Sequence, residues 1–269
     1  MRYWLSAVLL LVSLLARAEA PPPTIAIIID DLGNQGALGE RLLRIPVPMT
    51  LAYLPYRPFT ERQARMAPKY GKEVMLHIPM ENTKGLPLGA GAITLGMSPW
   101  AVMQTLRDAL RVIPNVEGVN NHMGSAYTAD RKHMDWIMTE LRQYPLYFVD
   151  SRTTAETEAY SAAQAAGIPA LSRDVFLDNE VNTASIDAQF RRLLEIARKT
   201  GHAIAIGHPH PETVAYLEKV LPTLDAQGIA IATVKGLWLQ KYNGVAMHFP
   251  VQRWPSQNQL ASLPKQVSR

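Results

Sequence analysis

The sequence contains no cysteine, and only 7% of its 269 residues are aromatic. Disulfide bonds are therefore excluded, the fold must be stabilised by an apolar core, and any metal site must use His, Asp, Glu or water as ligands. Lysine and arginine form no continuous block and the formal net charge is only +4, which argues against nucleic-acid binding. A Gly-x-x-x-x-Gly-Lys phosphate loop, a dinucleotide fingerprint after the first strand and a Gly-x-Ser-x-Gly elbow are also missing. Nucleotide binding and serine-nucleophile hydrolysis are therefore disfavoured.

No apolar run has the length of a membrane-spanning helix. The apolar stretch at residues 4–15 follows a positively charged start and precedes the small-x-small triplet Ala18-Glu19-Ala20. This pattern is typical of a secretory signal peptide over residues 1–20, with an uncleaved anchor as the alternative. We expect export to the periplasm and no membrane span after signal cleavage. The mature chain is expected to form one domain at 21–249 and an extended or disordered tail at 250–269.

Apolar, β-branched segments alternate with amphipathic helical stretches along the chain. The expected strands cover residues 24–29, 49–54, 73–77, 118–121, 146–150, 168–171, 202–207 and 229–234. Helices are expected after Ser98, after Thr128, near Ser185 and over residues 212–227. This alternation predicts an α/β fold with a parallel sheet, either a (β/α) barrel or an open doubly wound sheet. In both folds ligands bind at the carboxyl ends of the strands, which the long loop at 83–97 is expected to cover.

Asp30-Asp31 is the most informative feature of the chain. The pair ends an apolar run at residues 24–29 that is typical of a fully buried strand. Two adjacent carboxylates at the end of a core strand are costly without a partner. A divalent metal beside a general base would explain both of them, and a helix cap with a solvated neighbour is the alternative.

Polar residues suited to catalysis also follow the other expected strands. They are His77 with Glu81, the Asn120-Asn121-His122 string with Ser125, Asp150-Ser151-Arg152, Asp174, Asp178, His208 and His210. Each could be a turn, a cap or a hydrogen-bonded structural residue. Together they predict an active, or formerly active, site at one end of the sheet. His133, His202 and His248 lie outside this pattern and are interpreted as a helix-surface residue, a strand-start residue and a peripheral residue.

Histidines and carboxylates without cysteine are the ligand set of Zn²⁺ or a similar divalent ion with an open coordination position. Such an ion polarises a carbonyl oxygen and activates water. A carboxylate outside the ligand set can accept the proton of the water, and a histidine can protonate the leaving group. The pattern therefore favours metal-assisted hydrolysis of an amide or an ester.

Five strings in the chain together resemble the divergent polysaccharide deacetylase family, and the resemblance extends over residues 24–234. The strings are residues 28–34, 76–81, 118–125, 148–154 and 206–209. The resemblance implies a distorted (β/α)7 barrel in a single domain and the removal of acetyl groups from chitin-like sugars, peptidoglycan or xylan.

The resemblance also implies roles for individual residues. Asp30 would be the base, Asp31 and His77 would bind the metal, and His208 would be the catalytic histidine. The second metal-binding histidine of the larger superfamily is replaced by Glu81, and the Arg-Pro-Pro-Tyr type string is replaced by residues 120–123. His122 is our first choice for the third ligand and Glu81 the second. Asp150 and Asp178 would orient His208 or a ligand histidine. Expected substrate contacts are Glu81, Asn120, Asn121, Ser125, Arg152 and His210.

Three functions follow from these expectations. The first is an exported, Zn²⁺-dependent deacetylase of acetylated polysaccharide or peptidoglycan-like glycan. The second is a non-catalytic periplasmic glycan-binding or envelope protein on a deacetylase-like barrel, because fold does not fix function. The third is a metal hydrolase of a peptide amide or a phosphoester. The motif strings contain few basic residues besides Arg152 and Arg173, which argues mildly against a phosphate substrate.

Overall fold

The computed structural model describes residues 21–242. The expected signal peptide at 1–20 and the expected tail at 250–269 lie outside the described residues. The strands within the described part are β1 (Thr24–Leu32), β2 (Met49–Tyr53), β3 (Lys72–Met80), β4 (Val116–Met123), β5 (Tyr147–Asp150), β6 (Ala170–Ser172), β7 (Val175–Phe176), β8 (His202–Gly207) and β9 (Ala230–Ala232). The helices are α1 (Gly36–Arg44), α2 (Thr60–Met66), α3 (Pro99–Val112), α4 (Arg131–Leu141), α5 (Ala159–Ala165), α6 (Thr183–Thr200), α7 (Pro211–Val220) and α8 (Val234–Lys241).

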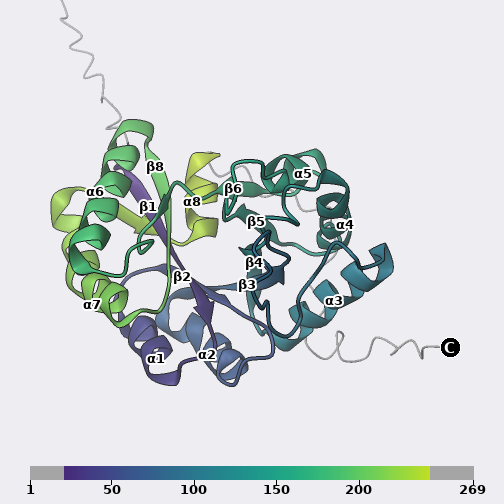
Figure 1. Ribbon diagram of the computed structural model, residues 1–269. Helices are drawn as coiled ribbons and strands as arrows, with labels where there is room; N and C mark the ends of the chain where they lie inside the picture. The colour runs from purple at the N-terminus through teal and green to yellow at the C-terminus, as the bar shows by residue number, and fades with distance from the viewer. Residues whose placement is uncertain (1–20, 243–269) are drawn as a thin grey trace, which may run out of the picture.

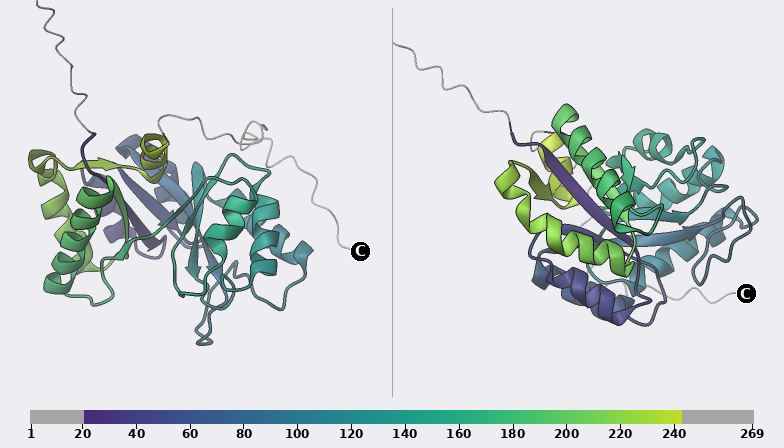
Figure 2. Two further views of the ribbon diagram at one scale, coloured as in Figure 1. Left: turned by 90° about the horizontal axis from the view of Figure 1, so that it is seen from above. Right: turned by 60° about the vertical axis from the view of Figure 1, so that its left-hand side comes forward.

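The strands form one parallel sheet in the order β6-β5-β4-β3-β2-β1-β8-β7, and β9 pairs with the first residues of β1. Figure 1 shows α1 to α7 arranged around the outside of this curled sheet, and Figure 2 shows the same layering from two other directions. The expectation of a distorted (β/α)7 barrel in a single domain is confirmed. The open doubly wound alternative is wrong, because the sheet curls around a second core of its own.

Two hydrophobic cores stabilise this arrangement. The larger core fills the space between the sheet and the outer helices and includes Ile25, Ile27 and Ile29 of β1. The smaller core lies on the inner face of the sheet and includes Ala26 and Ile28 of the same strand. Apolar residues are therefore needed on both faces of β1, which explains the continuous apolar run in the sequence.

The helix starts follow capping chemistry. Ser98 accepts a hydrogen bond from the backbone N–H of Ala101, and Pro99 occupies the first helical position of α3, as expected. Asp130 caps α4 and Asn182 caps α6, each a few residues from the position expected from the sequence. Helix α7 ends at Val220, and two short 3₁₀ turns complete the segment that was expected to be helical up to residue 227.

Helices α1, α2 and α5 were not among the expected elements, and two further elements differ from the sequence-based expectation. The two-residue strand β7 was not predicted, because so short a strand carries no readable periodicity. Val234 was expected to end a strand but begins helix α8, which contributes Val234 and Leu237 to the inner core. Helix α8 also meets a buried carboxylate, because Glu73 of β3 accepts a hydrogen bond from the backbone N–H of Lys235.

The sheet is open between β6 and β7, which do not pair with each other in the described part of the chain. Arg173 lies in the connection between them and donates hydrogen bonds to the backbone carbonyls of Ser151 (2.7 Å) and Arg152 (2.9 Å). Its guanidinium also lies 3.6 Å from the centre of the Phe176 ring. One arginine therefore links the end of β5 to β7 across this opening. No helix among residues 21–242 is both long enough and apolar enough to span a lipid bilayer.

Candidate metal centre

Strand alternation directs side chains from several strands toward one point. Successive side chains of a strand face opposite sides, so residues two apart share a face. Four strands contribute an apolar residue to the inner core shortly before they end: Ile28, Met75, Val149 and Ile206. Two positions later on the same strands or just beyond them come Asp30, His77, Ser151 and His208. The same alternation on β4 directs Asn120 and His122 inward, since an added Cβ at Gly118 would meet the ring of Tyr147 of the inner core.

Asp31 does not follow this alternation, because it is adjacent to Asp30 in sequence. The β1–β2 register shifts between Ile29 and Leu32, and Asp31 adopts a left-handed backbone conformation with φ of 58°. A bulge of this kind redirects one side chain of a strand. Both carboxylates therefore reach the same site, although a regular strand would separate them.

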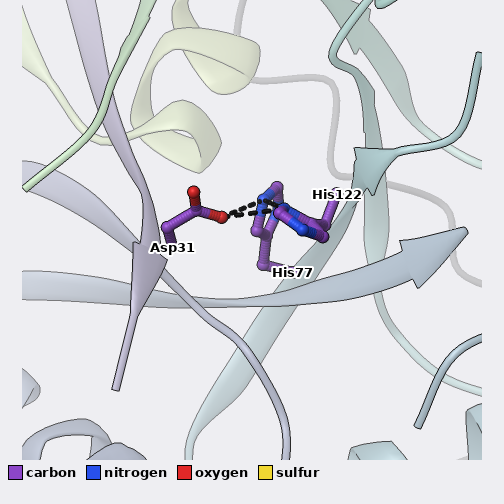
Figure 3. Close-up of side chains that lie close together, drawn as sticks. All are labelled: Asp31, His77 and His122. Atoms are coloured by element: carbon purple, nitrogen blue, oxygen red, sulfur yellow. Dashed lines mark hydrogen bonds and ion pairs between the residues drawn. The ribbon is translucent and has the colours of Figure 1, made fainter. Parts of the chain in front are cut away.

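Asp31, His77 and His122 converge within contact distance of one another (Figure 3). Oδ1 of Asp31 lies 2.8 Å from Nδ1 of His122 and 3.2 Å from Nε2 of His77. The two ring nitrogens lie 3.2 Å apart. His77 is buried, His122 is partly buried and the Asp31 side chain is 33% exposed, so the cluster opens toward solvent on one side.

The three atoms suit a tetrahedral cation. Zinc bonds of about 2.0–2.2 Å place neighbouring ligand atoms roughly 3.3 Å apart, close to the separations in the cluster. Oδ1 of Asp31 is buried but accepts no hydrogen bond of good geometry from either ring. Burial acts to raise the pKa of Asp31, but the two histidines outweigh it and lower this pKa, which keeps the carboxylate ionised. A divalent ion would therefore fit this donor set.

Asp30 lies beside the cluster without belonging to its ligand set. Its Oδ2 lies 3.6 Å from Nε2 of His77, and its Oδ1 accepts a hydrogen bond of 2.8 Å from Nδ2 of Asn120. Burial raises the pKa of Asp30 despite the opposing effect of His77 and His208. A buried carboxylate with a raised pKa beside a metal-type cluster has the properties of a general base.

A second polar pair adjoins the cluster. Nδ1 of His208 lies 2.8 Å from Oδ1 of Asp178, whose Oδ2 accepts hydrogen bonds from the His208 backbone and from Thr213. Burial acts to lower the pKa of His208, but the hydrogen bond and charge of Asp178 outweigh it and raise this pKa to about 9. His208 is therefore a cation at neutral pH, and its side chain is 29% exposed, so it can donate a proton to a bound molecule.

Asp178, His208 and His210 also lie close enough to hold a cation. The Asp178 carboxylate, however, is already occupied by Nδ1–H and backbone N–H of His208 and by the hydroxyl of Thr213. A carboxylate that bonds and orients a histidine in this way supports the histidine rather than a metal. We therefore interpret Asp178 and His208 as an acid dyad, with His210 at the start of α7 beside it.

The structure does not support substrate contacts for Asn120 and Asn121. Their exposed fractions are 0% and 1%, and their amides are fully engaged in the protein. Oδ1 of Asn121 accepts a hydrogen bond from the backbone N–H of Ser151, and its Nδ2 donates to the carbonyl of Met123. Burial of a side chain cannot be read from its residue type, which is why the sequence suggested a more exposed role.

Other predicted residues hold the loops around the site. Asp150 accepts hydrogen bonds from the backbone N–H of Arg152 and from Thr157, so it does not orient a histidine. Asp150 lies two residues after Phe148, which packs into the outer core, so both side chains share the outer face of β5. This explains why Asp150 does not reach a histidine of the site. Glu81 accepts a hydrogen bond from the backbone N–H of Leu95 and lies outside the metal-type cluster.

Ser125 bonds to the backbone N–H and hydroxyl of Thr83, and the Arg152 side chain is exposed. Among the remaining histidines, His202 begins β8 as expected. His133 is not a surface residue, because its side chain is only 13% exposed and its ring packs against Tyr127 and Trp136. His248 lies outside the described residues.

Sequence reasoning missed two supporting residues. The ring of Phe176 stacks on His208 at an interplanar angle of 25°, and Arg173 covers the same phenylalanine. Phe176 belongs to the two-residue strand β7, so no pattern in the sequence marked it. The two ring centroids are 6.1 Å apart, so Phe176 forms part of the surroundings of His208.

Relatives of this chain are found in two bacteria. It is 38% identical over 200 residues to the uncharacterized protein YibQ of Escherichia coli (strain K12). The aligned region covers 74% of this chain and 63% of the relative. It is 35% identical over 214 residues to an uncharacterized protein of Haemophilus influenzae, which covers 80% of this chain and 76% of the relative. The chain thus spans less than two thirds of the length of the Escherichia coli relative.

Solved structures share the fold. The uncharacterized protein ATU2773 of Agrobacterium tumefaciens C58 matches with a TM-score of 0.78 and 26% identity, over 82% of this chain and 91% of that one. A variant of the peptidoglycan deacetylase PdaC of Bacillus subtilis matches with a TM-score of 0.51 and 14% identity, over 82% and 93%. The second likeness shows the fold alone. The family described as divergent polysaccharide deacetylase matches residues 27–238, which is most of the chain. This protein therefore belongs to the divergent polysaccharide deacetylase family.

Proposed function

We propose that this protein is an exported, metal-dependent hydrolase that removes acetyl groups from a polysaccharide or peptidoglycan-like glycan. The observation that carries the proposal is the convergence of Asp31, His77 and His122, with separations of 2.8–3.2 Å between their ligand atoms. Asp30 and His208 lie beside this cluster, where Asp30 accepts a hydrogen bond from Asn120 and His208 is paired with Asp178.

The ligand set fits a divalent ion, and zinc is the metal that we propose. Such an ion would supply Lewis-acid chemistry toward a carbonyl oxygen and toward water. Asp30 would accept the proton of the attacking water, because its Oδ2 faces the cluster while Asn120 holds its Oδ1. The imidazolium of His208 would then donate a proton to the leaving amine or alcohol, and Asp178 would hold the ring in position.

Family membership supports the choice of an acetylated glycan. The family name specifies polysaccharide deacetylation, and PdaC, which shares the fold, is named as a peptidoglycan deacetylase. Export is part of the proposal and depends on the signal-peptide pattern over residues 1–20. A glycan of the cell envelope would then be accessible to the enzyme.

Acetate release tests this function directly. Zinc-reconstituted protein is incubated with N-acetylated chitooligosaccharides, peptidoglycan and acetylated xylan, and free acetate is measured with and without dipicolinate as chelator. We expect acetate from at least one substrate, loss of activity on chelation and recovery after zinc is returned. Activity that survives complete removal of metal would contradict the metal-dependent mechanism.

The same experiment separates the alternatives. A non-catalytic glycan-binding protein would bind one of these glycans, release no acetate and retain its affinity in Asp30→Asn. A hydrolase of peptide amides or phosphoesters would be inactive on all three glycans but would turn over a substrate of its own class in a metal-dependent manner.

A further inference from the structure

Asn120 connects the base to a metal ligand through one side-chain amide. Its Nδ2 donates to Oδ1 of Asp30 at 2.8 Å, and its Oδ1 lies 2.7 Å from Nδ1 of His77. A weaker third contact runs from Nδ2 to the hydroxyl of Ser151 at 3.3 Å. All of these groups are buried, and Asn120 itself has no exposed surface.

The orientation of this amide follows from its partners. The NH₂ group of Asn120 donates to Oδ1 of Asp30 and also lies within reach of the Ser151 hydroxyl. The carbonyl oxygen then faces His77, and this oxygen can only accept. Nδ1 of His77 must therefore carry a hydrogen, which leaves Nε2 directed at Asp31 and His122. Nε2 is the atom that a metal needs.

We infer that Asn120 is a positioning residue that acts on both sides of the reaction centre: it fixes the Nδ1–H form of His77 and aims Oδ2 of Asp30 at the cluster. This inference depends on the proposed function for its consequence, although the hydrogen bonds themselves do not require a metal. It also replaces the expected substrate contact of Asn120. A residue without exposed surface acts through Asp30 and His77 and cannot contact the glycan.

Asn121 provides a matched control. It is the same residue type on the same strand, is equally buried and also uses its amide in two hydrogen bonds. Those bonds go to the backbone of Ser151 and Met123, and neither reaches Asp30 or His77. Loss of a buried amide therefore affects stability in both variants, whereas only Asn120→Ala removes the connection between base and ligand.

Two readouts test the inference. The first is the Nδ1–H resonance of His77 in ¹⁵N-histidine-labelled, metal-free protein, assigned by its loss in His77→Gln. The second is zinc affinity, measured by competition with a chromophoric chelator. Asn120→Ala should lose the protected resonance and bind zinc about 10–100-fold more weakly, as is usual when a supporting partner of a ligand histidine is removed. Asn121→Ala should retain both properties.

Asn120→Asp tests separately the effect of Asn120 on His77 and its effect on Asp30. It also provides a test of the inference if Asn120→Ala does not fold. Aspartate retains the acceptor for His77 but places a second buried carboxylate against Asp30, so the two carboxylates share a proton and Asp30 becomes a poorer base. It should therefore retain the Nδ1–H resonance and bind zinc like the wild type, while kcat falls and KM changes little. The inference is overturned if Asn120→Ala retains the resonance and the zinc affinity, or if Asn121→Ala loses them equally. A wild type that binds no zinc would contradict the proposed function, and the resonance would still decide the role of Asn120.

Discussion

At the scale of single residues, the site depends on a departure from regular strand geometry at Asp31. A left-handed conformation at a residue other than glycine costs about 1–3 kcal/mol and persists where the surrounding structure holds it. Here it brings a second carboxylate beside Asp30, so adjacent residues can serve as base and ligand. The strain is located where the proposed mechanism uses two acids from one strand.

Asp30→Asn tests the division of labour between the two aspartates. We expect kcat for acetate release to fall about 10²–10⁴-fold, the usual contribution of a general base. Zinc stoichiometry should stay near that of the wild type, because Asp30 is outside the ligand set. Loss of metal together with activity would instead assign Asp30 to the metal.

The protonation of His208 provides a second test. In metal-free protein we expect His208 to titrate with a pKa of about 9, and Asp178→Asn should lower this pKa toward the ordinary histidine value. Because the pKa is raised in the folded state, the imidazolium stabilises the fold below about pH 6.5, and this contribution is lost as the pH rises through 9. NMR titration measures the pKa of His208 in the wild type and in Asp178→Asn.

His202 is the internal control for that titration. It lies at the opposite end of β8, and burial, with a smaller effect from Lys241, lowers its pKa. Its titration should not change in Asp178→Asn. An unchanged pKa of His208 in the variant would exclude Asp178 as the group that holds the acid protonated.

At the scale of elements, helix α8 meets the inner core at the amino ends of the strands. Glu73 of β3 connects helix α8 to neighbouring strands there. It accepts hydrogen bonds from Thr50, from the hydroxyl of Tyr147 and from the backbone N–H of Lys235. Thr50 in turn accepts a hydrogen bond from the backbone N–H of Val234. The start of α8 is thus attached to two strands by buried hydrogen bonds.

Glu73→Ala should reveal this attachment. The variant leaves several buried donors without an acceptor, and we expect the free energy of unfolding to fall by about 3 kcal/mol. The matched control is Glu117→Ala, which removes a glutamate with a 41% exposed side chain that pairs with Lys235, and it should cost under about 1 kcal/mol. Urea denaturation compares the two. Equal losses would show that α8 is not held through Glu73.

At the scale of the whole molecule, the order of elements was predictable and several local details were not. The continuous apolar run of β1 and the acids after it indicated a parallel sheet with a site at its carboxyl end. The side chains of α8 carry no clear apolar stripe, so its helical character was missed. The bulge at Asp31 was also missed, because aspartate tolerates a left-handed conformation without requiring it.

The site was predictable to a similar degree. Asp31, His77 and His122 follow from strand ends that a parallel sheet brings together, and resemblance suggested how they are used. The role of Asn120 could not be predicted, since it depends on which direction a buried amide faces. Asp150 was misjudged because its neighbour Phe148 packs outward, a distinction that a four-residue strand hardly shows.

The central claim is that Asp31, His77 and His122 hold one divalent ion, and metal stoichiometry tests it most directly. Wild-type protein, reconstituted with zinc and desalted, should contain about one ion per chain, as expected for three protein ligands with one open position. Asp31→Asn, His77→Ala and His122→Ala should lose the ion, whereas Glu81→Gln should retain it. A wild type without bound metal, or loss of metal in Glu81→Gln but not in His122→Ala, would contradict the account.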